Sequence, residues 1–385
     1  MVCSCWYSSV KVLHVYRTYF PDSQGGLEEV IRQICLGTGE KGVTSRVFTL
    51  SDEPYPRRLP RVECDVVRVR KTFEIASCGF ALTGLRQFAK EVAWADVVHY
   101  HYPWPFSDIL YLIAGRSKPA ILTYHSDIVR QKILLSLYRP LMSRYLSAMD
   151  KIVATSPNYF ATSEVLNEFA DKVEVVPIGL DEPSFPVLGP HDKTIAHARL
   201  IYGNDFFLFV GVLRYYKGLH ILLDAIKGAP YRVVIVGAGP VEAELREQAQ
   251  ALDLDNVVFA GFVSDKEKMA LFQLCRAVVF PSYLRSEAFG VTLLEGAMSS
   301  RALISAEVGS GTSHVNIHGE TGLVVPPSDS SALRSAMDTL FYDRDMAAQM
   351  GDKARARYEQ LFTGSAMGKR YTEIYAQVLE QKSAA

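Results

Sequence analysis

The chain has 385 residues, of which 49% are hydrophobic and 22% charged, a composition that predicts two or three globular domains and excludes a disulfide-stapled miniprotein or a disordered chain. Its 41 basic and 42 acidic residues give a formal net charge of −1, which excludes binding to nucleic acid through overall charge. The six scattered cysteines form no pair of C-x-x-C motifs, and no run of about 18 apolar residues predicts a membrane span, so we expect a cytoplasmic protein with reduced thiols.

Short apolar runs alternate with amphipathic segments along the first half of the chain. Seven runs have the length and residue types of buried strands: 11–16, 45–50, 64–69, 96–101, 120–125, 151–156 and 173–179. Amphipathic segments at 27–37 and 82–94 lie between some of these runs and predict helices. Strands that alternate with helices indicate βαβ units and a parallel sheet.

The same alternation begins again in the second half of the chain. Five further runs predict strands: 205–213, 231–239, 256–263, 277–282 and 301–306. A segment with three prolines and a glycine, 181–193, separates the two series and is the expected linker. Residues 329–360 and 365–382 predict helices. The sequence therefore predicts two doubly wound α/β domains, with a ligand cleft between them beyond the carboxyl ends of the strands.

Two glycines join the first predicted strand to its helix, in PDSQGGLEEVIRQI at 21–34. Gly25 and Gly26 would let backbone N–H groups approach a ligand, and the positive end of the helix dipole favours a phosphate. A tight turn with no ligand is the alternative, because Glu28 and Glu29 suit the first turn of any helix.

A histidine ends the fifth predicted strand, in LTYHSD at 122–127. His125 is a candidate ligand contact because His99 and His101 end the neighbouring strand, so that three imidazoles come from two strand ends. A histidine with satisfied hydrogen bonds inside the fold is the alternative. Zinc would use such histidines, but no cysteine or carboxylate partner is evident, so we expect no metal here.

The first two strands of the second series end in contrasting turns. FVGVLRYYKG places Arg214 and Lys217 before an apolar helix, where a guanidinium fork and an ammonium group together suit a diphosphate. A solvated basic loop is the alternative. VVIVGAGP at 233–240 lacks the third glycine of a dinucleotide fingerprint, because Glu242 stands in its place, and is expected to be a strand-to-helix turn.

The segment PSYLRSEAFGVTLLEGAMS at 281–299 carries two spaced carboxylates. Glu287 is expected in the loop before a helix that starts near residue 291, where N–H groups are free, and Glu295 about one turn into that helix. Carboxylates so placed would accept hydrogen bonds from hydroxyl groups on different parts of one polyol, and a solvated helix face is the alternative. The polar loop 321–329 would add Thr321 as a ligand contact.

Two Asp-x-Asp pairs, at 253–255 and 343–345, are candidates for a divalent cation. Neither pair closes an apolar strand, because the first would lie between a helix and a strand and the second in a helical region. Both pairs are expected to be solvated acids, and the protein is expected to act without a metal.

The motifs together resemble those of the family 4 retaining glycosyltransferases of the GT-B fold. GGLE, TYHSD, VGVLRYYKG, SEAFGVTLLE and TGLVVPP follow one another in the order of that family. The resemblance implies an acceptor domain at 1–185, a nucleotide-sugar domain at 186–364 and a last helix at 365–385 that crosses back to the first domain. It further implies that the leaving phosphate helps to deprotonate the acceptor on the same face of the sugar, with no protein nucleophile.

The resemblance also implies which residues surround the reacting bond. Arg214 and Lys217 would bind the donor diphosphate and stabilise the charge that builds on it as the bond breaks. Glu287 would hold sugar hydroxyl groups, and His125 would bind near the sugar and the reaction centre. These four residues form the predicted catalytic set.

Further residues are implied to bind the donor. Glu295 would bind the ribose, Val263 the base and Lys268 a guanine, with a surface lysine as the alternative for Lys268. The backbone around Gly290 would hold the sugar, and the Gly26 amide would approach the diphosphate from the other domain. The predicted donor-binding set is Gly25, Gly26, Val263, Lys268, Phe289, Gly290, Val291 and Glu295.

Two segments, HSDIVRQK at 125–132 and GSGTSHVNIHGETGLVVPP at 309–327, resemble bacterial mannosyl- and rhamnosyltransferases of lipopolysaccharide O-antigen assembly. This resemblance implies GDP-mannose or GDP-rhamnose as co-substrate, no other cofactor, and an undecaprenyl-diphosphate-linked N-acetylglucosamine or oligosaccharide as acceptor. The alternatives are transfer from a UDP-hexose, a nucleotide-sugar 2-epimerase, or a non-catalytic sugar- or nucleotide-binding module.

A lipid-linked acceptor implies peripheral contact with the inner face of the bacterial inner membrane. The stretch 57–71 contains six basic and two acidic residues. The stretch 128–149 carries four basic residues among apolar ones: Arg130, Lys132, Arg139 and Arg144. Basic and apolar side chains together bind anionic leaflets, and a buried helix with solvated arginines is the alternative.

Overall fold

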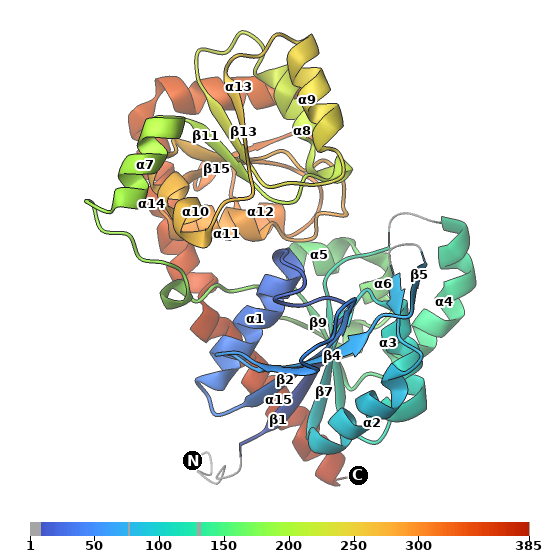
Figure 1. The fold of residues 1–385 in the computed structure, drawn as a ribbon. Coiled ribbons are helices and arrows are strands. Elements are labelled where there is room, and N and C mark those ends of the chain that lie inside the picture. The colour runs from blue at the N-terminus through green and yellow to red at the C-terminus, as the bar shows by residue number, and fades with distance from the viewer. Residues whose placement is uncertain (1–8, 76–77, 129–131, 385) are drawn as a thin grey trace. The chain divides into compact units, whose positions relative to one another are not determined.

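The structure is a computed structural model that describes residues 9–75, 78–128 and 132–384, with the side chains of the last range from residue 136 on. The chain divides into two compact units (Figure 1). Unit 1 comprises the described residues up to Thr155, Ser163–Gly179 and the described residues from Gly364 on, and unit 2 comprises Ser156–Thr162 and Leu180–Thr363.

Unit 1 contains an eight-stranded sheet in the order β10-β9-β8-β7-β1-β2-β4-β3, with only the edge strand β3 antiparallel. Its strands are β1 Lys11–Val15, β2 Thr44–Ser51, β3 Arg58–Pro60, β4 Asp65–Arg70, β7 Val97–Tyr102, β8 Ala120–Tyr124, β9 Lys151–Ala154 and β10 Val173–Val175. Every residue of β7 and β8 is buried, because helices cover both faces of a parallel sheet. A separate antiparallel pair is formed by β5 Phe73–Ile75 and β6 Cys78–Phe80.

The helices of unit 1 include one that comes from the far end of the described chain. They are α1 Gly26–Gly39, α2 Gly84–Trp94, α3 Pro105–Leu110, α4 Lys132–Ser147, α6 Glu164–Asn167 and α15 Gly364–Ala384. Figure 1 shows α15 running beside α1 against the sheet. Gly37 allows this approach, because a Cβ there would lie 2.5 Å from the carbonyl oxygen of Gly364. Gly368 faces Gly37 in the same contact, where its own Cβ would lie 2.2 Å from the Gly37 carbonyl carbon.

Unit 2 contains a six-stranded parallel sheet in the order β13-β12-β11-β14-β15-β16. Its strands are β11 Phe207–Val210, β12 Val233–Val236, β13 Val257–Gly261, β14 Ala277–Phe280, β15 Ala302–Ala306 and β16 Gly322–Val325. Its helices are α5 Pro157–Thr162, α7 Lys193–Tyr202, α8 Leu219–Ala225, α9 Glu242–Ala251, α10 Asp265–Leu274, α11 Val291–Met298, α12 Thr312–Val315, α13 Ser330–Tyr342 and α14 Arg344–Leu361. Figure 1 shows helices on both faces of the sheet.

Among the parallel strands of each main sheet, the strand order reverses once. In unit 1 the reversal lies between β1 and β7, and in unit 2 between β11 and β14. The loops that leave the two central strands then run to opposite faces of the sheet, which opens a crevice at the carboxyl ends of those strands. A ligand site is therefore expected at each of these two points.

All the predicted strands are present, and each unit is a doubly wound α/β sheet as expected. The expected loop 321–329 is wrong, because Gly322–Val325 pairs with β15 before Pro326 ends the strand. The expected linker, 181–193, lies wholly within unit 2. The chain leaves unit 1 just before it, where the Leu180 N–H donates to the carbonyl of Phe362 at 2.9 Å.

Candidate active site

In unit 2, two loops meet at the reversal point between β11 and β14. The loop after β11 carries Arg214 and Lys217, and the loop after β14 carries Glu287. The N–H of Tyr283 donates to the carbonyl of Tyr216 at 3.1 Å and joins the two loops. Ligands of doubly wound sheets bind at this point of the fold. Two motifs that are about 70 residues apart in sequence therefore belong to one place in unit 2.

Gly218 allows the two loops to approach each other. Its φ is 69°, in the left-handed region, and a Cβ on it would lie 2.0 Å from the carbonyl oxygen of Pro281. A side chain at this position would strain the backbone and push the loops apart. The glycine that ends the motif RYYKG thus fixes Lys217 beside the second loop.

Lys217 and Glu287 form an ion pair at this point. The ammonium of Lys217 donates to Glu287 Oε2, which also accepts from Ser282 Oγ at 3.2 Å. Only 13% of the Lys217 side chain and 10% of the Glu287 side chain are exposed. The ammonium also lies 4.6 Å from the centroid of the Phe280 ring. A bound diphosphate would therefore compete with Glu287 for Lys217, whereas Arg214 is exposed and has no carboxylate partner among the described residues.

A second ion pair joins α10 to α11. Lys268 Nζ lies 2.7 Å from Glu295 Oε1 and 3.2 Å from Asp265 Oδ1. Burial lowers the pKa of Lys268, but the two carboxylates outweigh burial and raise the pKa above its ordinary value. Only 17% of the Lys268 side chain is exposed, so the alternative of a surface lysine is wrong. Val263 is half-buried just after β13.

The start of α11 presents free backbone donors. Within the described chain, the N–H groups of residues 289–292 donate to no protein acceptor. Such groups, at the positive end of a helix, bind anions or hydroxyl oxygens. The ring of Phe289 is buried and packs against Phe362, so only the backbone of this residue is available to a ligand. Gly290 caps the helix with a φ of 85°, and Glu295 lies in the second turn, as predicted.

In unit 1, Gly25 and Gly26 form the start of α1 after β1. The carboxylate of Glu28 accepts from Ser23 Oγ at 2.7 Å and folds back onto Gly25, where a Cβ would lie 2.7 Å from that carboxylate. Gly26 is exposed. The predicted strand-to-helix turn is present. It is compatible with a phosphate site and equally with a tight turn that binds no ligand.

His125 follows β8 and is 6% exposed. Its Nε2 lies 3.0 Å from His101 Nδ1. Burial lowers the pKa of His125 to about 3, so the imidazole is neutral. His14, His99 and His101 offer ring nitrogens within 4.8 Å of one another, and sequence analysis missed His14 because it reads as an ordinary residue of an apolar strand.

Thr321 is not a ligand contact. It is 2% exposed, its hydroxyl donates to Asn316 Oδ1 at 3.1 Å, and it accepts from the N–H of Ile317 at 2.7 Å. The hydroxyl therefore holds the turn before β16. That prediction is wrong because the hydroxyl is already bonded within the turn that leads into β16, a strand that the sequence did not reveal.

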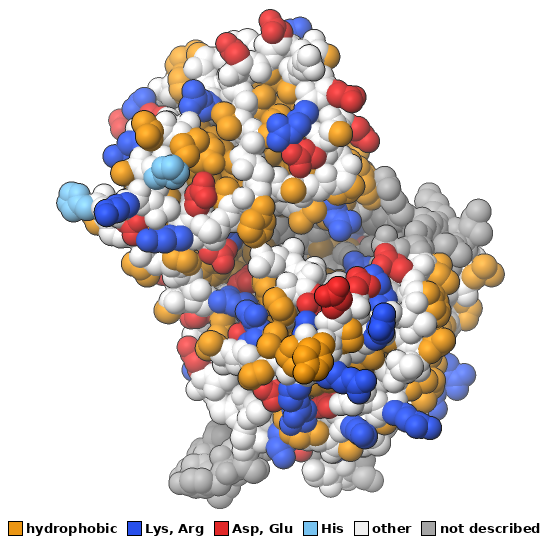
Figure 2. Space-filling view, viewed as in Figure 1, with side chains coloured by type: hydrophobic (Ala, Val, Ile, Leu, Met, Phe, Trp, Pro, Cys, Tyr) orange, Lys and Arg blue, Asp and Glu red, His pale blue; other side chains and the backbone are white. Residues whose placement is uncertain are grey.

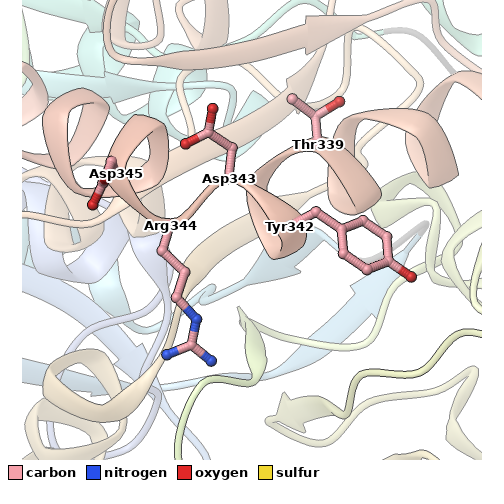
Figure 3. Close-up of a pocket in the computed structure, with 5 residues that line it drawn as sticks. All are labelled: Thr339, Tyr342, Asp343, Arg344 and Asp345. Carbon is pink, nitrogen blue, oxygen red and sulfur yellow. The ribbon is translucent and has the colours of Figure 1, made fainter.

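A shallow pocket of about 660 Å³ lies elsewhere on unit 2. Figure 3 shows its lining at the end of α13 and the start of α14: Thr339, Tyr342, Asp343, Arg344 and Asp345. Asp343 caps α14 by accepting from the N–H of Met346 at 2.8 Å, and Arg344 pairs with Asp205 at 2.7 Å. The pocket contains none of the predicted site residues. The first Asp-x-Asp pair, 253–255, lies between α9 and β13 as predicted.

Comparisons with known proteins identify the family. The family profile described as Glycosyltransferase Family 4 matches residues 24–182, and that described as Glycosyl transferases group 1 matches residues 193–357. The chain is 53% identical over 374 residues to D-rhamnosyltransferase WbpZ of Pseudomonas aeruginosa, covering 97% of this chain and 98% of that protein. The chain belongs to glycosyltransferase family 4.

This glycosyltransferase is also 47% identical over 375 residues to O-antigen chain mannosyltransferase C of Escherichia coli, covering 97% and 100% of the two chains. Its structure resembles sucrose-phosphate synthase of Thermosynechococcus elongatus, with a TM-score of 0.79 and 21% identity over 97% and 100% of the chains. It also resembles Anabaena HepE in complex with UDP and glucose, with a TM-score of 0.77 and 21% identity over 95% and 99%. The fold is of the GT-B type, as predicted.

The family favours a transferase over the epimerase and the binding module that the sequence left open. In the described part of the glycosyltransferase, no helix is both long and apolar enough to span a bilayer.

Proposed function

We propose that this glycosyltransferase transfers mannose or D-rhamnose from a GDP-sugar to a lipid-linked saccharide in O-antigen assembly. The proposal is carried by the likeness, over 97% of the chain, to a D-rhamnosyltransferase and an O-antigen chain mannosyltransferase. The acceptor would be undecaprenyl-diphosphate-linked N-acetylglucosamine or an oligosaccharide built on it.

Lys217 and Arg214 would stabilise the leaving diphosphate. Negative charge builds on the β-phosphate as its bond to the sugar breaks, and cations already in place lower the energy of that transition state. Lys217 is fixed between Glu287 and the Phe280 ring, and exposed Arg214 would supply a second charge. Because these residues supply positive charge, we propose that transfer requires no divalent cation.

Glu287 and the free N–H groups of residues 289–292 would hold the sugar. The carboxylate would accept from one sugar hydroxyl, and the N–H groups would donate to the oxygen of another. Glu295 would accept from the ribose hydroxyls. Lys268, which is bonded to Glu295, would contact guanine, with Val263 beside the base. The sugar and the nucleotide would therefore be recognised by different residues of unit 2.

Unit 1 would contribute His125 to the sugar and the amide groups of Gly25 and Gly26 to the diphosphate. The acceptor hydroxyl would attack the anomeric carbon on the face that the phosphate leaves. The hydroxyl proton would pass to the departing phosphate oxygen, so that the configuration of the sugar is retained. This route needs no carboxylate nucleophile.

A lipid-linked acceptor would bring unit 1 to the inner face of the inner membrane. Four of the six basic residues in 57–71 lie in ion pairs, whereas exposed Arg57 and Arg70 have no carboxylate partner in the described chain. Phe73 and Ile75 of β5, close to Arg70 in sequence, are 40% and 58% exposed. Figure 2 shows basic and apolar side chains interspersed on unit 1, a combination that binds anionic lipid.

The second basic and apolar stretch contributes less than its sequence implies. Arg130 and Lys132 lie outside the residues whose side chains are described. Arg139 pairs with Glu168 at 2.7 Å, and Arg144 is exposed. The apolar residues Met142, Tyr145 and Leu146 are buried, whereas Leu137 is 77% exposed. The membrane surface that we propose centres on β5, and the exposed Leu137 and Arg144 of α4 would form a second contact.

The donor is tested by incubation with GDP-mannose, GDP-rhamnose or UDP-glucose, with and without the diphospho-lipid acceptor, in EDTA. Transfer from one GDP-sugar in EDTA is the expected result. Transfer from UDP-glucose alone would overturn the donor assignment, and a need for Mg²⁺ or Mn²⁺ would overturn metal independence.

Membrane contact is tested by sedimentation with phosphatidylglycerol vesicles. The wild-type protein should sediment with the vesicles, and Phe73→Ser/Ile75→Ser should sediment less. Tyr342→Ser is the matched control, because Tyr342 is a 73% exposed aromatic residue of unit 2. Equal sedimentation of the wild type with and without vesicles would refute membrane contact.

A further inference from the structure

Four buried histidines gather at the centre of the unit 1 sheet, on β1, on β7 and just after β8. His14, His99 and His101 have no exposed surface. Three of the four form a row, which we call the histidine row: His14 Nδ1 lies 3.1 Å from His101 Nε2, and His101 Nδ1 lies 3.0 Å from His125 Nε2. Neighbouring rings in the row are stacked, with centroids 5.4 and 5.3 Å apart.

His99 belongs to the cluster but not to the row. Its Nδ1 lies 2.9 Å from the hydroxyl of Tyr375, and its Nε2 lies 2.7 Å from Thr123 Oγ1. Both nitrogens of His101 are also bonded within the row. Of the three histidines that could surround an ion, His14 alone has an unpartnered ring nitrogen, so a metal would have to break bonds that already satisfy the cluster.

The two hydrogen bonds of the row cannot be set independently. A neutral imidazole has one N–H donor and one acceptor nitrogen. If His101 carries its proton on Nδ1, it donates to His125 Nε2 and accepts from the Nδ1–H of His14. If the proton is on Nε2, both bonds reverse. The row therefore has only two states, and each state fixes the tautomer of His125.

The far end of the row decides between the two states. His14 Nε2 is buried and has no hydrogen-bond partner. In the first state this nitrogen carries a lone pair that accepts from no donor. In the second state it carries a proton that has no acceptor. Buried N–H groups with no acceptor are rare, so the first state is favoured. In that state His125 carries its proton on Nδ1, a nitrogen with no partner among the described residues.

We propose that His14 and His101 are positioning residues that hold His125 as the Nδ1–H tautomer and make it a hydrogen-bond donor to the donor sugar. This role rests on the proposed function, in which His125 binds near the sugar. The row is no proton relay, because its inner end at His14 has no group to which a proton can pass.

The surroundings keep the row uncharged. Burial lowers the pKa of His14 and of His125 to about 3, and lowers those of His99 and His101 well below the ordinary value. In the described chain, no carboxylate is bonded to any of the four rings. Among the residues that the structure describes, the ionisable groups whose rings contact the cluster from other segments are the phenols Tyr16, Tyr371 and Tyr375. His125 therefore acts as a neutral donor and not as an imidazolium acid.

Nitrogen NMR of histidine-labelled protein tests the tautomer without any measurement of activity. The signals of His125 are assigned by their loss in His125→Ala. We expect a protonated Nδ1 and a bare Nε2, unchanged between pH 5 and pH 8. A proton on Nε2, or titration of His125 within that range, would overturn the proposal.

Variants test whether the row imposes this tautomer. His101→Phe keeps a ring but no donor, so the His125 tautomer should be lost and kcat should fall about 10- to 100-fold, as when the partner that orients a functional histidine is removed. The KM for the GDP-sugar should change much less. His101→Asn returns a donor near the Nδ1 position and should recover most of kcat. His14→Phe should allow both tautomers at His125.

His99→Phe is the matched control, because it removes two hydrogen bonds from the same buried cluster and none from the row. It should lower stability while keeping the His125 tautomer and kcat. Wild-type kcat in His101→Phe would overturn the positioning role alone. The expected tautomer in a wild-type protein that transfers no sugar would overturn the proposed function alone.

Discussion

Replacing Lys217 by methionine removes one charge of a buried ion pair and keeps an unbranched stem over the Phe280 ring. Glu287 would then be a carboxylate whose side chain is 10% exposed, with Ser282 as its remaining donor at 3.2 Å. Removing one partner of a buried pair costs about 3–5 kcal/mol, because an uncompensated charge stays behind. The residual exposure of Glu287 and its bond from the Ser282 hydroxyl favour the low end of this energy range. We therefore expect Lys217→Met to destabilise unit 2 by about 3 kcal/mol.

The same substitution should slow sugar transfer for a different reason. Loss of one group that stabilises transition-state charge lowers kcat by about 10²- to 10³-fold. Adding Glu287→Gln removes the unpaired carboxylate, so the double variant should recover stability to within about 1 kcal/mol of the wild type. It should not recover kcat, because no ammonium returns to the diphosphate and the Glu287 carboxylate that would hold the sugar is also lost. Stability and activity should therefore separate in the double variant.

Urea unfolding followed by circular dichroism measures the stability of these variants, and release of GDP measures kcat. Tryptophan fluorescence serves as an internal control, because all three tryptophans of the sequence precede residue 156, and Trp94 and Trp104 report on unit 1. Recovery of kcat together with stability in the double variant would refute the reasoning. Lys217 would then serve only to neutralise Glu287, and the diphosphate would bind elsewhere.

Three further substitutions test other parts of the molecule. Glu295→Gln should weaken GDP binding at least about tenfold, because an amide accepts ribose hydroxyls less well and Lys268 loses its partner; calorimetry that gave wild-type affinity would contradict this. Gly218→Ala should destabilise unit 2 by more than about 1 kcal/mol in urea, because its Cβ would meet the carbonyl of Pro281, and wild-type stability would show that the loops yield freely. Burial raises the pKa of Asp108 from 3.8 to about 7, so the folded protein binds this proton more tightly than the unfolded chain, and the free energy of unfolding should fall as pH rises from about 4 to about 7. In urea unfolding followed by fluorescence, Asp108→Asn should lack this fall in unfolding free energy with pH. Parallel plots of unfolding free energy against pH for the variant and the wild type would contradict the raised pKa.

The strand series could be predicted because strands buried on both faces of a parallel sheet read as continuous apolar runs. The strands that were missed are too short for such a run. β3, β5 and β6 have three residues each, and β16 has a short apolar run that begins at a glycine and ends before Pro326. Their formation depends on a neighbouring strand that supplies the hydrogen bonds, which no local pattern reveals.

Candidate site residues could be proposed one motif at a time, but the partners that the structure gives them could not be predicted. The bond between Lys217 and Glu287 depends on the reversal of strand order, which places the loops after β11 and β14 together. The pairing of Lys268 with Glu295 depends in the same way on how α10 and α11 pack. His14 gave no signal, because a lone polar residue in an apolar strand carries no information about which strand will lie beside it.

The position of α15 has a consequence for protein synthesis. The ribosome makes α15 after the whole of unit 2, yet this helix packs on α1, and its Tyr371 and Tyr375 bond to Thr123 and His99. While unit 2 is being translated, those buried polar groups lack their partners, and the nascent first unit has not reached its final packing. Unit 1 therefore completes its folding after unit 2 has been synthesised, and a chain truncated before α15 carries its defect in the unit that was made first.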